Sequence, residues 1–137
     1  MSLGTRLLQG FLTFLTVFEL ISIYEHLPTD LGGKGGDLSG MGSNLPSEDP
    51  ARRLWCFMLA LLVCARVTAV AAPYNAAAMA QCAAVHVLEL MYMGGEYLLY
   101  GCDGERFIFC FIVFDALLFT AVALRRIGSS GAKTKTK

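Results

Sequence analysis

The chain has 137 residues, of which 55% are hydrophobic and only 16% charged, and its 11 basic residues equal its 11 acidic residues. Soluble domains average about 25% charged residues, so this composition cannot give a compact domain of this size a polar surface. Its balanced charge gives no indication of a nucleic-acid partner, because such partners attract a basic surface. The apolar excess therefore indicates a chain that faces a lipid bilayer.

Four long apolar runs with few charged residues predict four membrane-spanning helices. A helix needs about 20 residues to cross a hydrocarbon layer of ~30 Å. We place the spans at residues 7–26, 54–72, 76–100 and 107–124. The second and fourth runs have no polar face, which argues against a soluble helical bundle. The predicted fold is an all-α integral membrane four-helix bundle that forms a single domain over residues 1–137.

The segments outside these spans are short, with one exception. Residues 28–52 are rich in Gly, Ser, Asp and Pro, so we expect an irregular and mobile loop without a phosphate-binding motif. The other two connections, around Pro73–Asn75 and 101–106, are short, which makes the last three helices antiparallel neighbours. Residues 125–137 are expected to form a basic tail.

The basic residues predict the orientation in the membrane. An even number of spans places both termini on one side, and that side carries more lysine and arginine than the other, which favours cytosolic or matrix-side termini. The basic residues on the terminal side are Arg6, Arg125, Arg126, Lys133, Lys135 and Lys137. Lys133 and Lys135 also match the K-x-K-x-x form of an endoplasmic-reticulum retrieval signal. A basic tail beside anionic lipid headgroups is the alternative interpretation.

Ionisable side chains inside the spans are costly in lipid and normally face a partner within the bundle. Glu19, Arg66, Glu89 and Asp115 come from four different predicted helices. Counted along the helices at ~1.5 Å per residue, they fall in one slab less than ~8 Å thick. We therefore predict a buried polar network in which Arg66 hydrogen-bonds at least one of the acids.

Two further features follow from the antiparallel arrangement of the second and third spans. Arg53 and Glu96 lie nearly the same number of residues from Tyr74, which predicts an ion pair near the membrane surface. On the third span, small residues recur at every fourth position, a pattern that lets another helix approach closely. These residues are Ala76, Ala80 and Ala84.

Candidate catalytic and metal sites are weak. The pair His86 and Glu89 has the reverse order of a di-iron motif and no second copy, and His26 lies too far from His86 in depth for a shared haem. Five cysteines, at positions 56, 64, 82, 102 and 110, form no C-x-x-C pair and are interpreted as packing residues. We expect no enzyme activity, no cofactor and no metal. A proton relay through the intramembrane acids remains an alternative.

One stretch of the chain resembles the ergosterol biosynthetic protein 28 family of small four-span membrane proteins. The similar positions are Arg53, Arg66, Asn75, Glu96, Tyr100 and Gly101, the last three matching the family's E-x-x-x-Y-G. The chain departs from the family where Leu54-Trp55-Cys56-Phe57 replaces an aromatic-Gly-x-Trp run, and its first loop is longer and richer in glycine.

The resemblance implies a non-catalytic scaffold of the endoplasmic-reticulum membrane. Such proteins hold the sterol C-4 demethylation enzymes together: an oxidase, a dehydrogenase/decarboxylase and a ketoreductase. The main alternative is an accessory subunit of a respiratory or ATP synthase complex in the mitochondrial inner membrane. The second alternative is a small proton-coupled carrier that uses the intramembrane acids.

Overall fold

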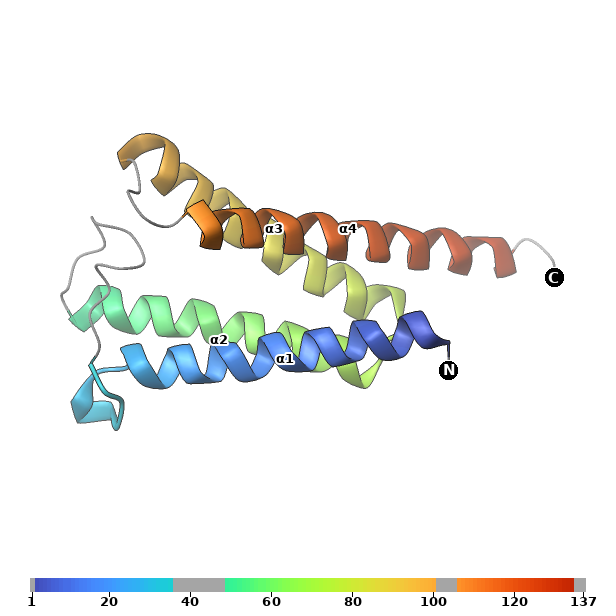
Figure 1. Ribbon diagram of the computed structural model, residues 1–137. Helices are drawn as coiled ribbons and strands as arrows, with labels where there is room; N and C mark the ends of the chain where they lie inside the picture. The colour runs from blue at the N-terminus through green and yellow to red at the C-terminus, as the bar shows by residue number, and fades with distance from the viewer. Residues whose placement is uncertain (1, 36–48, 101–105, 135–137) are drawn as a thin grey trace.

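The computed structural model describes residues 2–35, 49–100 and 106–134. Within these ranges the protein is all-α. It consists of the helices α1 (Leu3–His26), α2 (Asp49–Ala71), α3 (Ala76–Tyr100) and α4 (Arg106–Thr134), with a 3₁₀ turn, η1 (Thr29–Leu31), after α1. Figure 1 shows both termini at the same end of the bundle, as an even number of antiparallel passes requires.

The ends of the helices follow from local chemistry. The Ser2 hydroxyl accepts a hydrogen bond from the Thr5 backbone N–H, which caps the start of α1, and Pro28 follows shortly after its end. Pro73 separates α2 from α3. The side-chain oxygen of Asn75 then accepts hydrogen bonds from the N–H groups of Ala77 and Ala78 at 2.9 and 3.2 Å. Asn75 is therefore the N-cap of α3.

Both described ends of the loop predicted at residues 28–52 have regular structure. Its first residues fold back onto the end of α1, since Lys34 N–H donates to Tyr24 O at 3.0 Å and Gly35 N–H donates to Leu27 O at 2.9 Å. At its other end α2 already begins at Asp49, because Pro50 fits the first turn of a helix, where no N–H is needed. Residues 36–48 lie outside the described residues.

The predicted tail at residues 125–137 also needs correction, because α4 continues to Thr134. Arg125 and Arg126 are good helix formers, whereas Gly128, Ser129, Ser130 and Gly131 are weak ones, so helix propensity explains only the start of this extension. Hydropathy marks only the end of the apolar run.

Three helices of the described chain are long and apolar enough to cross a membrane: Leu3–His26, Arg52–Ala71 and Ala76–Gly95. Their apolar side chains are turned outward as well as inward; Phe14, Leu88 and Met91 are more than 60% exposed. This composition supports a membrane location. The fourth predicted span, 107–124, begins with side chains that lie outside the described residues.

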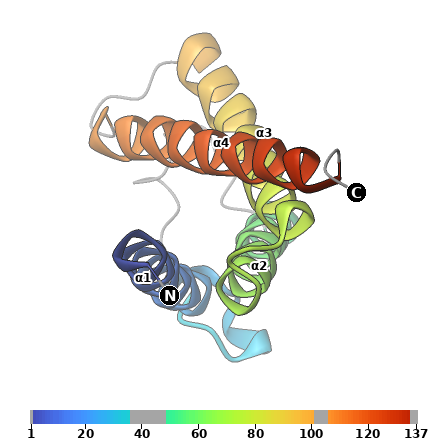
Figure 2. The same ribbon diagram turned by 90° about the vertical axis from the view of Figure 1, so that its right-hand side faces the viewer.

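The helices pack in chain order, α1 against α2, α2 against α3 and α3 against α4. The four described helices show no comparable backbone contact between α1 and α4, and Figure 2 shows these two helices facing each other across the bundle. Figure 1 also shows α3 diverging from α2 as it runs away from their connecting turn. The bundle is therefore tight at the end with the termini and more open at the other end.

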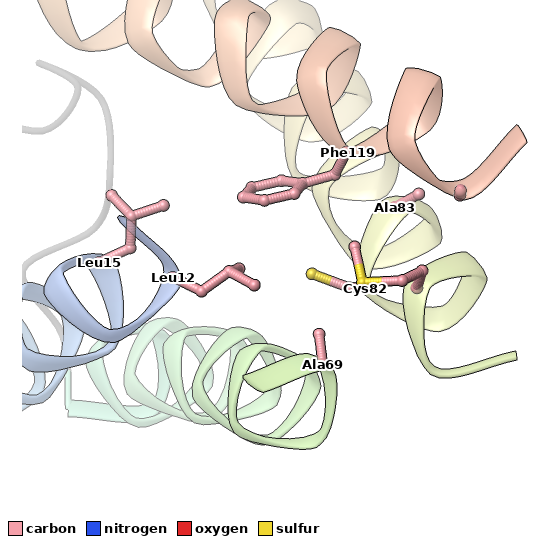
Figure 3. Close-up of a cluster of buried hydrophobic side chains, with 8 residues drawn as sticks. Leu12, Leu15, Ala69, Cys82, Ala83 and Phe119 are labelled. Atoms are coloured by element: carbon pink, nitrogen blue, oxygen red, sulfur yellow. The ribbon is translucent and has the colours of Figure 1, made fainter. Parts of the chain in front are cut away.

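Two clusters of apolar side chains form the core. The first unites all four helices near the termini, and Figure 3 shows Leu12 and Leu15 of α1 facing Phe119 of α4, with Ala69 and Cys82 beside them. Phe11 adds edge-to-face ring contacts to Phe111 and Phe114, so aromatic side chains bridge α1 and α4 where the backbones stay apart. The second cluster contains Trp55, Leu59, Leu62, Met93 and Ile112.

Candidate functional site

Arg66 is the centre of a buried polar layer between the two apolar clusters. It lies on α2 between Leu62 of one cluster and Ala69 of the other, and only 2% of its surface is exposed. Its Nη1 donates to Glu19 Oε1 at 3.0 Å and to the backbone oxygen of Leu15 at 3.3 Å. A buried guanidinium is tolerated only when its donors are satisfied, and these two bonds tie α2 to α1.

His86 of α3 is the second partner of Arg66. Arg66 Nε–H donates to His86 Nε2 at 3.1 Å, while His86 Nδ1 lies 2.7 Å from the backbone oxygen of Cys82. Both contacts are satisfied by a neutral imidazole that carries its proton on Nδ1 and accepts on Nε2. The ring is fully buried and packs at 4.5 Å between centroids on Phe119.

Asp115 of α4 completes the layer. Its Oδ2 lies 4.0 Å from Arg66 Nη2, an ion-pair distance longer than a hydrogen bond, and the residue is 2% exposed. Through Glu19, His86 and Asp115, the guanidinium of Arg66 reaches all three other helices. The structure thus brings together three of the four residues predicted for the network: Arg66 contacts both Glu19 and Asp115.

Glu89, the fourth predicted member, lies at the edge of the layer. It is partly exposed and lines the same cavity as Glu19, Arg66 and Asp115. Within the described part of the chain, its carboxylate has no hydrogen-bond donor. The layer therefore holds three carboxyl groups around one guanidinium, an arrangement with an excess of acceptors over donors.

The cavity beside this layer has a volume of about 280 Å³ and is bounded by side chains of all four helices. Its walls are apolar and include Phe14 and Phe18 of α1, Leu59, Met93 and Phe111. Phe14 and Phe18 are also more than half exposed, so they form the rim on the outer side of α1. We call this space the α1–α4 cavity, because the separation of these two helices leaves it unfilled.

Two buried polar atoms on the wall of this cavity lack a partner within the described residues: Asp115 Oδ1 and Trp55 Nε1. Most buried polar groups in proteins are hydrogen-bonded, because desolvating one without compensation costs about 1–3 kcal/mol. One of these atoms is an acceptor and the other is a donor. Their common location makes the α1–α4 cavity the best candidate for a binding site in the described chain.

The interfacial pair predicted between Arg53 and Glu96 stays a prediction, because only the Arg53 side of it is described. Arg53 Nη2 donates to Asp30 Oδ2 at 3.2 Å, so it fastens the loop after α1 to the start of α2. The prediction assumed that α2 and α3 stay side by side, whereas Figure 1 shows them diverging. The side chain of Glu96 lies outside the described residues.

The other residues singled out in the sequence have separate places. Asn75 is the α3 cap described above, so its position in the family resemblance has a local structural reason. The side chains of Tyr100 and Lys133, and the whole of Gly101 and Lys135, lie outside the described residues.

The four cysteines among the described residues divide into two groups, and Cys102 lies outside the described residues. Cys56 and Cys82 are buried, as expected of small packing residues, whereas Cys64 and Cys110 are exposed on the outside of the helices. The described residues contain no group of three or more His, Cys, Asp or Glu side chains arranged to hold a metal ion.

His86 is the member of the polar layer that the sequence analysis considered only as a metal or haem ligand. Its depth was visible from its position on α3, four residues after Cys82 and three before Glu89. A histidine at the same depth as a buried arginine was the available signal. Sequence alone does not show the rotation of α3 that turns the imidazole toward Arg66.

Comparisons of the chain with protein-family models, with curated proteins and with solved structures find no match.

Proposed function

We propose that the chain is a non-catalytic integral membrane scaffold, a four-helix bundle whose outer surface holds partner proteins in a membrane complex. The observation that carries this proposal is the outer face of α3. It consists of Ala77, Gln81, Ala84, Leu88 and Met91, which recur at steps of three and four and are all exposed. We call this surface the α3 outer face.

Gln81 is the residue that makes this face suited to a protein partner rather than to lipid alone. Its amide has no hydrogen-bond partner within the described residues, although it lies inside the predicted span 76–100. An amide in a hydrocarbon environment gains from a hydrogen bond across a helix–helix contact. Ala77 and Ala84 flank it, and small residues allow the backbone of another helix to approach closely. Ala84 is also part of the small-residue edge that the sequence predicted.

The interior of the bundle supports the same proposal. Arg66 donates hydrogen bonds to His86 and to Glu19, and these two bonds connect α2 to α3 and to α1. A rigid bundle with an apolar exterior suits a protein that positions others. The resemblance to the ergosterol biosynthetic protein 28 family extends the proposal to the sterol C-4 demethylation enzymes, with the chain in the endoplasmic-reticulum membrane and its termini in the cytosol.

The experiment that tests the proposal is a mild-detergent pull-down of the tagged full-length chain, with co-purifying proteins identified by mass spectrometry. Gln81→Leu and Ala84→Phe should each reduce the co-purifying proteins, because one removes the amide and the other blocks close approach. Leu117→Ala on α4, where the leucine is 65% exposed, is the matched control and should leave them unchanged. Equal recovery with all three variants would exclude the α3 outer face as the docking surface.

The identity of the recovered proteins separates the candidate complexes. Sterol-modifying enzymes would support the endoplasmic-reticulum scaffold, whereas respiratory or ATP synthase subunits would support the mitochondrial alternative. Fluorescent tagging of the chain gives the organelle independently.

Membrane insertion has its own test. In sealed membranes, a water-soluble maleimide should not label the outward-facing Cys64, because lipid surrounds it and excludes the reagent. A cysteine introduced as Asp30→Cys, in the loop after α1, should react on the side opposite the termini. Rapid labelling of Cys64 would contradict the membrane-spanning arrangement.

The carrier alternative has one favourable observation, the carboxyl group of Glu89 on the wall of the α1–α4 cavity. Reconstitution in vesicles with a pH gradient tests it. Proton flux that Glu89→Gln abolishes would support a carrier, and the absence of flux in the native chain would leave the scaffold as the proposal.

A further inference from the structure

We propose that the α1–α4 cavity binds an uncharged membrane lipid whose polar end is a hydroxyl group, with that hydroxyl donating to Asp115 Oδ1. This proposal concerns a ligand inside the bundle and is independent of the protein partner proposed for the α3 outer face.

One carboxyl oxygen of Asp115 lacks a hydrogen-bond donor among the described residues. Asp115 is 2% exposed, and its Oδ1 has no donor among the described residues, while its Oδ2 faces Arg66. A carboxyl oxygen that carries no proton accepts hydrogen bonds and donates none. The missing partner of Oδ1 is therefore a donor, such as an O–H group.

The polar end of the α1–α4 cavity is rich in carboxyl groups. Glu19, Glu89 and Asp115 surround the single guanidinium of Arg66, so the polar end of the cavity already has more carboxyl groups than cations. An anionic headgroup would be repelled there. A hydroxyl supplies the donor without adding negative charge, and it costs less to transfer from water than an ammonium group.

The part of the α1–α4 cavity beyond the acidic side chains is apolar and opens toward the outer side of α1. The volume of about 280 Å³ is near the lower end of the range for small-molecule sites, and the walls beyond the acids are aromatic and aliphatic. Phe14 and Phe18 are partly exposed at the rim on α1, where a membrane lipid would enter sideways between α1 and α4. The ligand thus needs an apolar body in addition to its hydroxyl.

Trp55 provides both a second contact and a probe. Its buried Nε1–H lacks an acceptor among the described residues and lies on the wall of the same cavity, so an oxygen atom of the ligand or a bridging water can accept from it. It is also the single tryptophan of the chain, which makes the intrinsic fluorescence specific for this wall.

The test measures quenching of Trp55 fluorescence in the full-length chain, reconstituted in phosphatidylcholine nanodiscs. The probes are 9,10-dibromo-octadecan-1-ol, its methyl ether and 9,10-dibromostearic acid, which share one chain and differ at the polar end. We expect saturable quenching by the alcohol, with half-saturation at a mole fraction about tenfold or more below that of the ether, because the ether lacks the donor. The acid should also bind more weakly than the alcohol.

Two variants locate the site. Ser22→Leu fills the cavity from α1 and should abolish saturable quenching, and Asp115→Leu should remove the preference for the alcohol over the ether. Leu117→Ala, outside the cavity, should leave both unchanged. Asp115→Leu removes a buried charge partner and risks misfolding. The comparison of the three probes on the native chain therefore tests the preference for a hydroxyl group without any variant. Equal half-saturation for alcohol and ether, or quenching that rises linearly with each probe, would overturn the proposal.

Discussion

Arg66 on α2 donates from Nε to His86 Nε2 on α3 across 3.1 Å, and neither side chain is more than 2% exposed. This contact fixes the relative rotation of the two helices, because a guanidinium and an imidazole meet in this way over a narrow range of angles. Another nitrogen of the same guanidinium, Nη1, pairs with Glu19 of α1. One residue therefore aligns helices that are far apart in the sequence, and we expect the stability of the bundle to depend on it.

Replacing Arg66 should destabilise the bundle strongly. Arg66→Met keeps much of the apolar stem but leaves Glu19 and Asp115 without their cation, and removing one partner of a buried pair costs about 3–5 kcal/mol. The free energy of unfolding of Arg66→Lys should lie between those of the native chain and of Arg66→Met, since one ammonium cannot reproduce the separate bonds of a guanidinium. The free energy of unfolding is measured by titrating the detergent-solubilised chain with dodecyl sulfate.

Arg53→Met is the control for this series, because the Arg53–Asp30 pair is more than half exposed on both sides. Such pairs contribute less than about 1 kcal/mol. The double variant Arg66→Met/Glu19→Gln should be more stable than the sum of its single changes. Equal effects of Arg53→Met and Arg66→Met would show that the polar layer does not hold the helices together.

His86 should be replaceable by a residue that accepts a hydrogen bond. His86→Leu leaves the Arg66 Nε–H without an acceptor, which costs about 1–3 kcal/mol, whereas the amide oxygen of His86→Gln can still accept. Thermal unfolding followed by the fluorescence of Trp55 gives the comparison. If Leu and Gln lower the melting temperature equally, packing against Phe119 rather than the hydrogen bond accounts for the role of His86.

Asn75 should stabilise the chain through its cap. Asn75→Ala removes the acceptor for the N–H groups of Ala77 and Ala78, at a cost of about 1 kcal/mol, while Asn75→Asp keeps it and adds a favourable charge at the start of α3. The same unfolding titration measures both. If Asn75→Ala left the free energy of unfolding unchanged, water would satisfy the N–H groups of Ala77 and Ala78 equally well.

Lys34, outside the predicted spans, should show the effect of its partner Glu25. The hydrogen bond from Lys34 Nζ to Glu25 Oε1, at 2.6 Å, and the charge of that carboxylate raise the pKa of Lys34 above its ordinary 10.5. Because the folded-state pKa is the higher one, any stabilisation from the pair is complete below pH 10.5 and is lost as the pH rises through the folded-state value.

Acetylation followed by mass spectrometry measures this shift, since only the uncharged amine reacts. At pH 9 the native Lys34 should react more slowly than Lys34 of a Glu25→Gln variant. The difference should shrink as the pH rises above the folded-state pKa. Equal rates at pH 9 would show that the pair does not form in solution.

The sequence by itself determined the all-α class, the ends of several helices and the depth of the charged residues. These properties are local: hydropathy marks an apolar helix, proline and asparagine mark its ends, and a constant rise per residue converts position into depth. Glu19, Arg66 and Asp115 could therefore be predicted to share one layer, as they do.

The tertiary structure decided how each helix is rotated and tilted. The position of a residue along its helix gives no information about these angles. Rotation turns His86 rather than a carboxylate toward Arg66 Nε, and it leaves Asp115 Oδ1 on the wall of a cavity. Tilt separates the far ends of α2 and α3, and Arg53 at the start of α2 pairs with Asp30 in the loop after α1. These angles result from the packing of side chains from all four helices at once, and this is why residue spacing predicted the polar layer but not the cavity beside it.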